Sequence, residues 1–364
     1  MTEVLGNPKP SRWAARTQPP ELSVAIFGLG YWGSKLLRNL FEVDGLQVSF
    51  GCDSDTAVLE AQRRHYRHLP LTPDVNHVLA DDGVDAVIVA TPISNHYELA
   101  RQALLAGKHV LVEKPLAGSL GEAEELAELA AERGLVLMPG HTFLYSPPVR
   151  AVRELLDRGE LGRIYFGTSS RVNLGIHQRD TSVIRDLAPH DFSILLYWLG
   201  RPSYVRAAGR AAVMDDIVDV AFIDVGYPDG CLVHIDLSWL APTKLRRTVL
   251  VGERKMVVYD DTSPEQVRIF DNGVDRVEGH SFGEFQLAYR TGDILTPRLD
   301  AAEPLRLELE DFVAAIRSGR PPRSDSGLGV DVVGMTEAAE ESLARDGATV
   351  HLEAGRAAGS HVRA

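Results

Sequence analysis

A glycine-rich segment near the amino end constrains the fold of this chain more than any other feature. Gly28-Leu29-Gly30-Tyr31-Trp32-Gly33 has the spacing G-x-G-x-x-G, follows an apolar run at 22–27 and precedes a helical pattern. Asp53 lies twenty residues after Gly33, just past the next apolar run. In this context the glycines allow a tight turn and a close approach to a pyrophosphate, whose charge the helix N-terminus attracts. The segment therefore predicts a strand–helix–strand unit that binds a dinucleotide; a tight turn without a ligand is the alternative.

The choice of dinucleotide depends on Asp53. An acid at the end of the second strand accepts hydrogen bonds from the adenosine ribose hydroxyls, and its charge repels a 2′-phosphate. Asp55 adds to that repulsion, so we expect NAD rather than NADP as the cofactor. A solvated acid at the strand end is the alternative for Asp53. The predicted cofactor contacts in this part of the chain are Gly28, Gly30, Tyr31, Trp32, Gly33 and Asp53.

Short apolar runs alternate with helical patterns from residue 21 to residue 140. Further apolar runs occupy 85–90, 109–112 and 135–138. Between the last two, Ser119 and Glu122 have the spacing of a capping box, and Gly134 is placed to end the helix that they begin. Strands that alternate with helices predict a doubly wound parallel sheet, a Rossmann domain.

The second half of the chain has a different pattern. Alternating apolar and polar residues over 220–239 predict a hairpin that turns at 227–230, and a second hairpin is expected over 248–259. Helices are expected at 304–317 and 329–344, packed on one side of the sheet. The predicted fold is α/β: an N-terminal Rossmann domain, and a C-terminal α+β domain with a large, mainly antiparallel open sheet. The expected bounds are a disordered lead-in at 1–20, the NAD-binding domain at 21–145, the substrate-binding and oligomerisation domain at 146–350 and a loose tail at 351–364.

Composition excludes several kinds of protein. Acids outnumber bases by 51 to 38, a net charge of −13, whereas a nucleic-acid binder needs cations to neutralise phosphates. We expect neither a signal peptide nor a membrane span, since the apolar runs are too short. The two cysteines, Cys52 and Cys231, give no disulfide framework and fit a reducing cytoplasm. His65 and His68 have the spacing of metal ligands but no carboxylate or thiol partner nearby, so we expect no metal site.

Polar residues follow two of the predicted strands, where a doubly wound sheet binds its ligand. Thr91, Pro92, Asn95 and His96 follow the strand at 85–90 and are predicted to line the nicotinamide half of the cofactor. For His96, a role in capping the next helix is an equal alternative. Glu113-Lys114-Pro115 ends the strand at 109–112, and Glu113 and Lys114 are also predicted to contact the cofactor. A lysine beside a cationic nicotinamide has a lowered pKa and exchanges a proton at neutral pH. From spacing alone, an ordinary surface lysine is the alternative. The sequence does not decide whether the Lys114–Pro115 bond is cis or trans.

The segment Asp186-Leu187-Ala188-Pro189-His190 is the second candidate for proton transfer. Because Ala188 precedes a proline, we expect Pro189 to be the first residue of a helix and His190 to lie in its first turn. A helix N-terminus disfavours imidazolium, so His190 is expected to be neutral, with Asp186 just outside the helix orienting it. A histidine that caps its own helix is an even alternative. Three arginines precede this segment: Arg171, Arg179 and Arg185. They suit a substrate with a diphosphate or a carboxylate, and solvated surface arginines are the alternative.

Together these motifs resemble the glucose–fructose oxidoreductase/inositol dehydrogenase/MocA superfamily of dinucleotide-dependent sugar and cyclitol oxidoreductases. The resemblance covers residues 21 to 345 and depends on G-L-G-Y-W-G at 28–33, E-K-P at 113–115 and the D-x-x-x-H of Asp186 and His190. It implies that Lys114 and His190 handle the proton, with Asp186 in support. It also implies a homodimer or homotetramer, formed through the open antiparallel sheet.

Within the superfamily the chain looks most similar to the 3-dehydrogenases of UDP-N-acetylglucosamine and its uronate. This resemblance depends on G-H-T-F-L-Y at 140–145, R-V-N-L-G at 171–175, L-A-P-H-D at 187–191 and W-L-A-P-T-K-L-R at 239–246, while 176–184 departs from the pattern. The implied reaction is NAD-dependent oxidation of a nucleotide sugar at C3. Substrate contacts are expected from Lys114, Arg171, Asn173, Arg179, Asp186 and His190. Reduction of a 3-keto sugar, a cyclitol substrate, an NAD-dependent glycosidase and a non-catalytic dinucleotide sensor are the alternatives.

Overall fold

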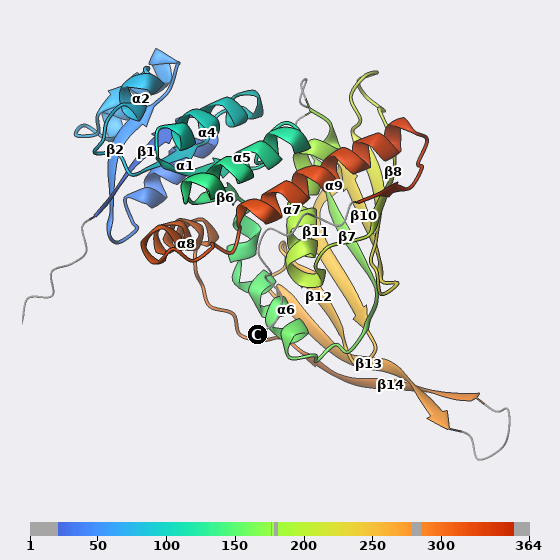
Figure 1. The fold of residues 1–364 in the computed structure, drawn as a ribbon. Coiled ribbons are helices and arrows are strands. Elements are labelled where there is room, and N and C mark those ends of the chain that lie inside the picture. Colours follow the sequence, from blue (N-terminus) through green and yellow to red (C-terminus); the bar gives the residue numbers. More distant parts are fainter. Residues whose placement is uncertain (1–20, 176, 178–180, 279–284, 353–364) are drawn as a thin grey trace, which may run out of the picture.

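A six-stranded parallel sheet organises the amino-terminal half of the computed structural model, which describes residues 21–175, 177, 181–278 and 285–352 (Figure 1). Its strands lie in the order β3-β2-β1-β4-β5-β6. They are β1 (Leu22–Phe27), β2 (Leu46–Cys52), β3 (Leu71–Thr72), β4 (Ala86–Val89), β5 (His109–Glu113) and β6 (Leu137–Gly140). The order reverses between β1 and β4, so the carboxyl ends of these two strands flank a crevice for a ligand. The predicted Rossmann sheet is thus confirmed.

Five helices cover this sheet: α1 (Tyr31–Leu40), α2 (Thr56–His65), α3 (Val75–Leu79), α4 (His96–Leu105) and α5 (Leu120–Arg133). The capping box of α5 is confirmed, because Ser119 and Glu122 bond reciprocally and Gly134 ends the helix in the left-handed conformation. The following strand starts at Leu137 rather than at the predicted 135. Leu135 still belongs to the end of the helix, where its amide donates to the carbonyl of Ala130.

A nine-stranded sheet organises the second half, in the order β14-β13-β12-β11-β7-β10-β9-β8-β15. Its strands are β7 (Ile164–Leu174), β8 (Tyr204–Arg210), β9 (Val220–Gly226), β10 (Leu232–Ser238), β11 (Leu240–Gly252), β12 (Met256–Asp260), β13 (Val267–Glu278), β14 (Phe285–Leu295) and β15 (Val350–His351). Within the described residues of this sheet, β7 and β10 are the one pair that runs in parallel. Both predicted hairpins are confirmed, as β9–β10 and β11–β12.

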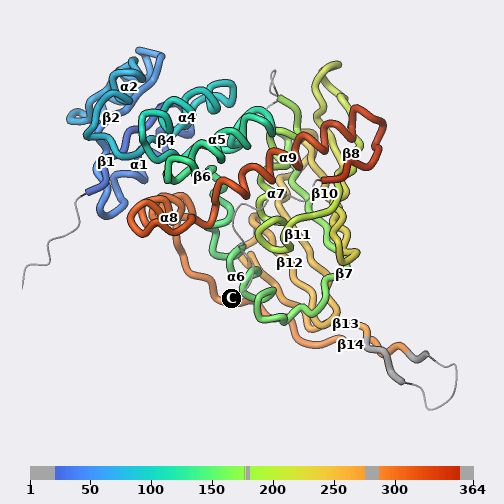
Figure 2. Tube along the Cα trace, in the orientation of Figure 1, coloured from blue at the N-terminus to red at the C-terminus, as the bar shows by residue number. Residues whose placement is uncertain are grey.

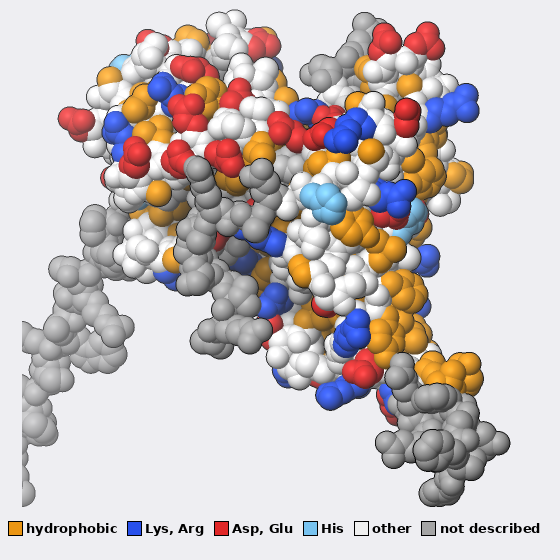
Figure 3. Space-filling view, turned by 45° about the vertical axis from the view of Figure 1, so that its right-hand side comes forward, with side chains coloured by type: hydrophobic (Ala, Val, Ile, Leu, Met, Phe, Trp, Pro, Cys, Tyr) orange, Lys and Arg blue, Asp and Glu red, His pale blue; other side chains and the backbone are white. Residues whose placement is uncertain are grey.

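Helices α6 (Pro147–Asp157), α7 (Val183–Leu199) and α9 (Ser326–Ala344) pack on one side of this sheet, and its other face stays open. Phe166 and Phe222 are each 47% exposed and Leu232 is 42% exposed on the open face. Apolar side chains also line the side of the molecule formed by this sheet (Figure 3). The predicted oligomer through this face stays a prediction.

Two helices link the halves of the molecule (Figure 2). α8 (Pro304–Ser318) packs on α1 and on the short 3-10 helix η2 (Thr142–Tyr145), and α9 packs on both α5 and α7. The predicted bounds of the two domains stay a prediction, and the lead-in at 1–20 and the tail from 353 lie outside the described residues. His351, assigned to the tail, instead pairs with Tyr204 in β15–β8.

Candidate functional site

The glycine turn after β1 has no room for side chains at two of its glycines. Gly28 has a φ of +88°, and a Cβ there would lie 2.5 Å from the carbonyl oxygen of Ala90. A Cβ on Gly33 would lie 2.0 Å from the carbonyl oxygen of Gly28, so α1 crosses the end of β1 in direct contact. Gly30, by contrast, faces open space and begins α1 without a side-chain cap. The first turn of α1 therefore offers amide groups to an anion.

Asp53 lies directly beside this turn. Its Oδ2 accepts a hydrogen bond of 2.8 Å from the amide of Leu29, and its Oδ1 accepts one of 2.9 Å from the amide of Asp55. Both bonds hold the carboxylate at the end of β2, next to the glycine turn. This arrangement fits the predicted contact with an adenosine ribose.

A cavity of about 1070 Å³ opens between the two halves of the molecule. It lies next to the ends of β4, β5 and β6, and α7, β11 and α8 close it from the other side. The predicted site residues that line it are Trp32, Thr91, Pro92, His96, Glu113, Lys114, Arg185, Asp186 and His190. The lining does not include Gly28, Gly30, Tyr31, Gly33, Asp53, Asn95, Arg171 or Asn173. Arg179 lies outside the described residues.

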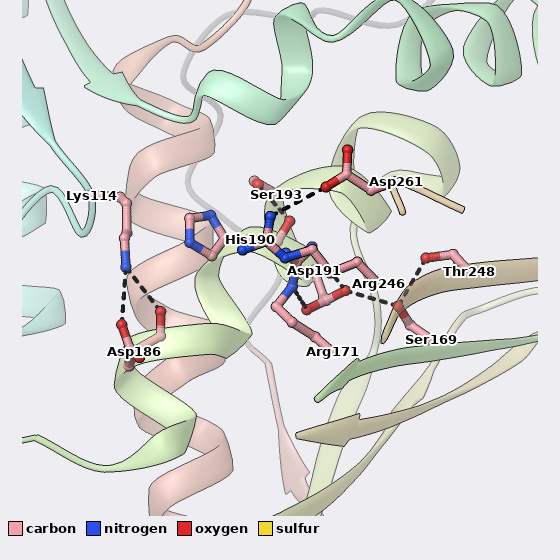
Figure 4. A network of polar contacts seen from close by, with 10 residues as sticks. All are labelled: Lys114, Ser169, Arg171, Asp186, His190, Asp191, Ser193, Arg246, Thr248 and Asp261. Carbon is pink, nitrogen blue, oxygen red and sulfur yellow. Dashed lines mark hydrogen bonds and ion pairs between the residues drawn. The ribbon is translucent and has the colours of Figure 1, made fainter. Parts of the chain in front are cut away.

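Lys114 and Asp186 meet across the cavity from different halves of the chain. The Nζ of Lys114 donates to the main-chain oxygen of Asp186 over 2.9 Å and lies 3.4 Å from its Oδ1 (Figure 4). Both side chains are about four-fifths buried, with 22% and 23% of their surfaces exposed. The Lys114–Pro115 bond is cis. The ammonium group is thus fixed at the wall of the cavity.

His190 lies beside Lys114 (Figure 4). Its ring packs edge to face against Phe143 at a centroid distance of 5.2 Å. Burial lowers its pKa well below the ordinary value, and the nearby charges of Lys114 and Arg171 lower it further. The imidazole is therefore neutral near pH 7 and able to accept a proton.

The prediction that Pro189 begins the helix was wrong. α7 begins at Val183, with the Oγ of Ser182 accepting from the amide of Arg185, and Pro189 lies inside the helix. Asp186 is therefore in the first turn rather than outside the helix, and His190 is one turn further along. Buried apolar residues such as Val183 and Ile184 hold the earlier turn against the core, which outweighs the local preference of Ala188. Burial, not a helix N-terminus, accounts for the neutral ring of His190.

Comparisons with known proteins identify the family to which both halves of the chain are similar. Residues 22–141 match a family model described as an oxidoreductase family with an NAD-binding Rossmann fold, and residues 149–258 match the GFO/IDH/MocA C-terminal domain. An uncharacterized oxidoreductase of Synechocystis sp. is 30% identical over 342 residues, which cover 86% of this chain and 92% of that protein. The chain belongs to the GFO/IDH/MocA oxidoreductase family.

Two further proteins are similar to this chain over most of its length. The UDP-N-acetylglucosamine 3-dehydrogenase of Acidithiobacillus ferrooxidans is 28% identical over 309 residues, covering 85% of this chain and 93% of the relative. The crystal structure of GenD2 from gentamicin A biosynthesis, in complex with NAD, matches with a TM-score of 0.77 at 27% identity. That match covers 92% of this chain and 97% of GenD2.

NAD is the cofactor of this family member, and the residues present fit it. The open space at Gly30 and the uncapped first turn of α1 would receive the pyrophosphate, and Asp53, held beside the same turn, would accept hydrogen bonds from the ribose hydroxyls. The indole of Trp32 donates to the Oε1 of Glu113 at the cavity wall. Burial raises the pKa of Glu113 to about 7.

His96 also supports this wall. Its two ring nitrogens lie 2.8 Å from the carbonyl oxygens of Thr91 and Pro115, so it ties the chain after β4 to the chain after β5. The ring is buried, and burial lowers its pKa. These contacts favour a structural role for His96, at the start of α4, although the residue also lines the cavity.

Arg171 lies behind His190 rather than in the cavity lining. Its guanidinium pairs with Asp191 over 2.6 Å, and both side chains are almost fully buried. Ser169 donates to Asp191 over 2.8 Å (Figure 4). The ring of Phe143 packs against the guanidinium at 4.7 Å. Asn173, two residues further along β7, is half-buried. The predicted substrate contacts of Arg171 and Asn173 stay predictions.

Sequence reasoning missed several residues of the site. Phe143 and Arg246 line the cavity and lie inside segments singled out for their resemblance, 140–145 and 239–246, but neither was assigned a role. Asp261 also lines the cavity, and it pairs with Arg246 over 3.2 Å. Asp261 directly follows β12, and the β11–β12 hairpin places it opposite Arg246. No local pattern marks it as a site residue.

Metal and membrane sites are not found in the described part of the chain. Among residues 21–175, 177, 181–278 and 285–352 no group of three or more His, Cys, Asp or Glu side chains is placed to hold a metal ion. Within the same ranges no helix is both long and apolar enough to cross a membrane.

Proposed function

We propose that this protein is an NAD-dependent dehydrogenase that oxidises a secondary alcohol of a sugar, at C3 of a nucleotide-linked sugar such as a UDP-N-acetylhexosamine or its uronate. The observation that carries the proposal is the meeting of Lys114, Asp186 and His190 at one cavity beside the NAD-binding turn. A pure dinucleotide sensor has no need for a neutral histidine and a fixed ammonium group at this place.

Each of the three residues has a chemical role in the proposal. The neutral imidazole of His190 accepts the proton of the substrate hydroxyl, as a general base does. The ammonium of Lys114 donates a hydrogen bond to the same oxygen and stabilises the negative charge that develops there. Asp186 holds Lys114 through two oxygens. Bound NAD supplies the hydride acceptor.

The cavity supports a substrate that carries phosphate groups. Besides Lys114, the lining includes Lys35 and the guanidinium groups of Arg38, Arg185 and Arg246. A guanidinium group donates two parallel hydrogen bonds to phosphate oxygens, so these arginines suit the diphosphate of a nucleotide sugar. The relative from Acidithiobacillus ferrooxidans, named for its action on UDP-N-acetylglucosamine at C3, is similar over most of this chain.

A substrate panel tests the proposal. The purified protein is mixed with excess NAD and, one at a time, UDP-hexosamines, UDP-uronates, free sugars and cyclitols. We expect NADH absorbance and a loss of two hydrogens from one nucleotide sugar, seen by mass spectrometry. Activity on free sugars or cyclitols alone would contradict the nucleotide-sugar substrate. Release of a leaving group without net NADH would replace the dehydrogenase with a glycosidase.

Substitution of Lys114 tests the assigned chemistry. In Lys114→Ala we expect turnover to fall by about 10²–10³-fold, the usual range for losing one donor that stabilises a developing negative charge on oxygen. The affinity for NAD should change little, because the glycine turn and Asp53 remain. Lys255→Ala is the matched control. The Nζ of Lys255 lies 2.9 Å from the Oε2 of Glu160, and Lys255 does not line the cavity. Full activity in Lys114→Ala would remove the lysine from the mechanism.

A further inference from the structure

A buried tryptophan contacts the carboxylate that holds Lys114. Trp239 lies between β10 and β11 and is only 2% exposed. Its Nε1 donates a hydrogen bond of 3.2 Å to the Oδ2 of Asp186. The Oδ1 of the same carboxylate lies 3.4 Å from the Nζ of Lys114. The two carboxylate oxygens therefore have different partners, the indole on one side and the ammonium on the other.

This division of contacts fixes the orientation of Asp186. A carboxylate with one partner rotates about its Cβ–Cγ bond, whereas donors on both oxygens leave it one orientation. Because Asp186 is in the first turn of α7, its main-chain oxygen is set by the helix and already accepts from Lys114. The side-chain contact to Lys114 is the part that needs an additional restraint.

The chain holds Trp239 itself in place through its backbone and its ring. The amide of Trp239 donates to the carbonyl of Asp219 over 3.0 Å, and its carbonyl accepts from the amide of Gly175 over 2.9 Å. The ring of His177 packs against the indole edge to face, at 5.5 Å. A Cβ on Gly175 would lie 2.9 Å from the Cδ1 of Trp239, so glycine at this position makes room for the indole.

We propose that Trp239 is a positioning residue, which acts through Asp186 to hold the ammonium group of Lys114 against the substrate oxygen, and that Gly175 is required to seat it. The expected effect on kcat rests on the proposed function, whereas the expected effect on the position of Lys114 does not. The proposal also gives a physical reason for Gly175 and Trp239, which lie in the segments 171–175 and 239–246 and had no assigned role.

Trp239→Phe removes the indole N–H and keeps an aromatic ring. We expect kcat to fall about tenfold, which corresponds to losing one hydrogen bond to a charged group, with the affinity for NAD changed less than about twofold. Trp198→Phe is the matched control, because the Nε1 of Trp198 donates to the carbonyl of Val149 over 2.9 Å, it is 4% exposed and it does not line the cavity. Equal losses of kcat in the two variants would overturn the proposal.

A double-mutant cycle separates positioning from general destabilisation. If Trp239 acts through the carboxylate, Trp239→Phe should change kcat less than about twofold once Asp186→Ala is present. If Trp239 only supports the fold, the two losses multiply, and the proposal fails. Gly175→Ala gives a second route to the same contact, since its methyl group displaces the indole, and it should lower kcat in the wild-type background only.

A substrate-free measurement keeps this inference separate from the proposed function. Lys114 is acylated with acetic anhydride at pH 7, and its labelling rate is read by peptide mass spectrometry relative to that of Lys255. We expect Lys114 to react at least about three times faster in Trp239→Phe than in Trp198→Phe, because its carboxylate partner is no longer held toward it. Equal rates overturn the inference. A wild-type protein inactive on every substrate overturns the proposed function while this result still stands.

Discussion

Asp53 is the residue on which the choice between NAD and NADP depends. Its carboxylate is fixed by the amides of Leu29 and Asp55, so its charge stays where a 2′-phosphate would lie. In Asp53→Ala we expect the affinity for NAD to fall about tenfold, since a hydrogen-bonded carboxylate contact of this kind is worth roughly 1.4 kcal/mol. Titration of intrinsic fluorescence with each dinucleotide measures both affinities.

Asp53→Asn is the control that separates charge from hydrogen bonding. The amide oxygen can still accept one of the two backbone bonds, but the negative charge is gone. We expect this variant to bind NADP better than the wild type does, because the repulsion of the 2′-phosphate is removed. Unchanged affinities for NAD in Asp53→Ala would count against the ribose contact.

At the level of elements, helix α7 carries both Asp186 and His190, so its start matters for the site. Ser182 caps this helix: its Oγ accepts from the amide of Arg185 and donates to the Oε1 of Glu340 over 3.0 Å. We expect Ser182→Ala to destabilise the protein by about 1 kcal/mol, as loss of an N-cap does, and to lower turnover as well. Urea unfolding and steady-state rates measure the two effects.

Asp74→Ala provides the comparison for this cap. Asp74 begins α3 and its Oδ1 accepts from the amides of Asn76 and His77, and it does not line the cavity. We expect a similar loss of stability with unchanged turnover. An equal fall in turnover for both variants would mean that lost stability alone, and not the start of α7, is responsible.

The same helix shows how far the sequence allowed prediction. The strands, the glycine turn, the capping box of α5 and both hairpins follow from local periodicity and turn residues, and the structure has all of them. The start of α7 was misplaced because the rule for residues before proline is local, whereas the burial of Val183 and Ile184 is a tertiary effect. The hairpin of β11 and β12 was predicted, but not that it brings Asp261 to the site. Trp239 reaches Asp186 because β10 and β11 both pair with β7, which no local pattern reveals.

At the scale of the whole molecule, the two halves meet on a polar interior. Glu308 of α8 is buried and accepts from Thr142 over 2.8 Å, and burial, together with Glu113, raises its pKa well above the ordinary value. The pKa of Glu113 is raised to about 7, mainly by burial. Between pH 4.5 and 7 the folded chain still holds a proton on Glu113 that the unfolded chain has lost. The contribution of this carboxyl to the stability of the fold therefore decreases as the pH rises through this range.

His141, in the same interior, has the opposite effect on stability. Its side chain is 1% exposed, and burial, with a smaller contribution from the charge of Lys114, lowers its pKa to about 3. Between pH 3 and 6.5 the unfolded chain holds a proton on this ring that the folded chain does not. Stability therefore falls as pH drops through this window, and His190 acts in the same direction.

Replacing the ring of His141 isolates its contribution from those of Glu113, Glu308 and His190. In His141→Gln we expect the midpoint of thermal unfolding to fall less between pH 7 and pH 5 than in the wild type, because glutamine does not bind a proton in this range. His65→Gln, at an exposed position in α2, should keep the wild-type slope. Parallel unfolding curves for His141→Gln and the wild type at both pH values would show that His141 gains its proton equally in the folded and unfolded chains. Its burial between the two halves would then contribute nothing to the acid sensitivity of the fold.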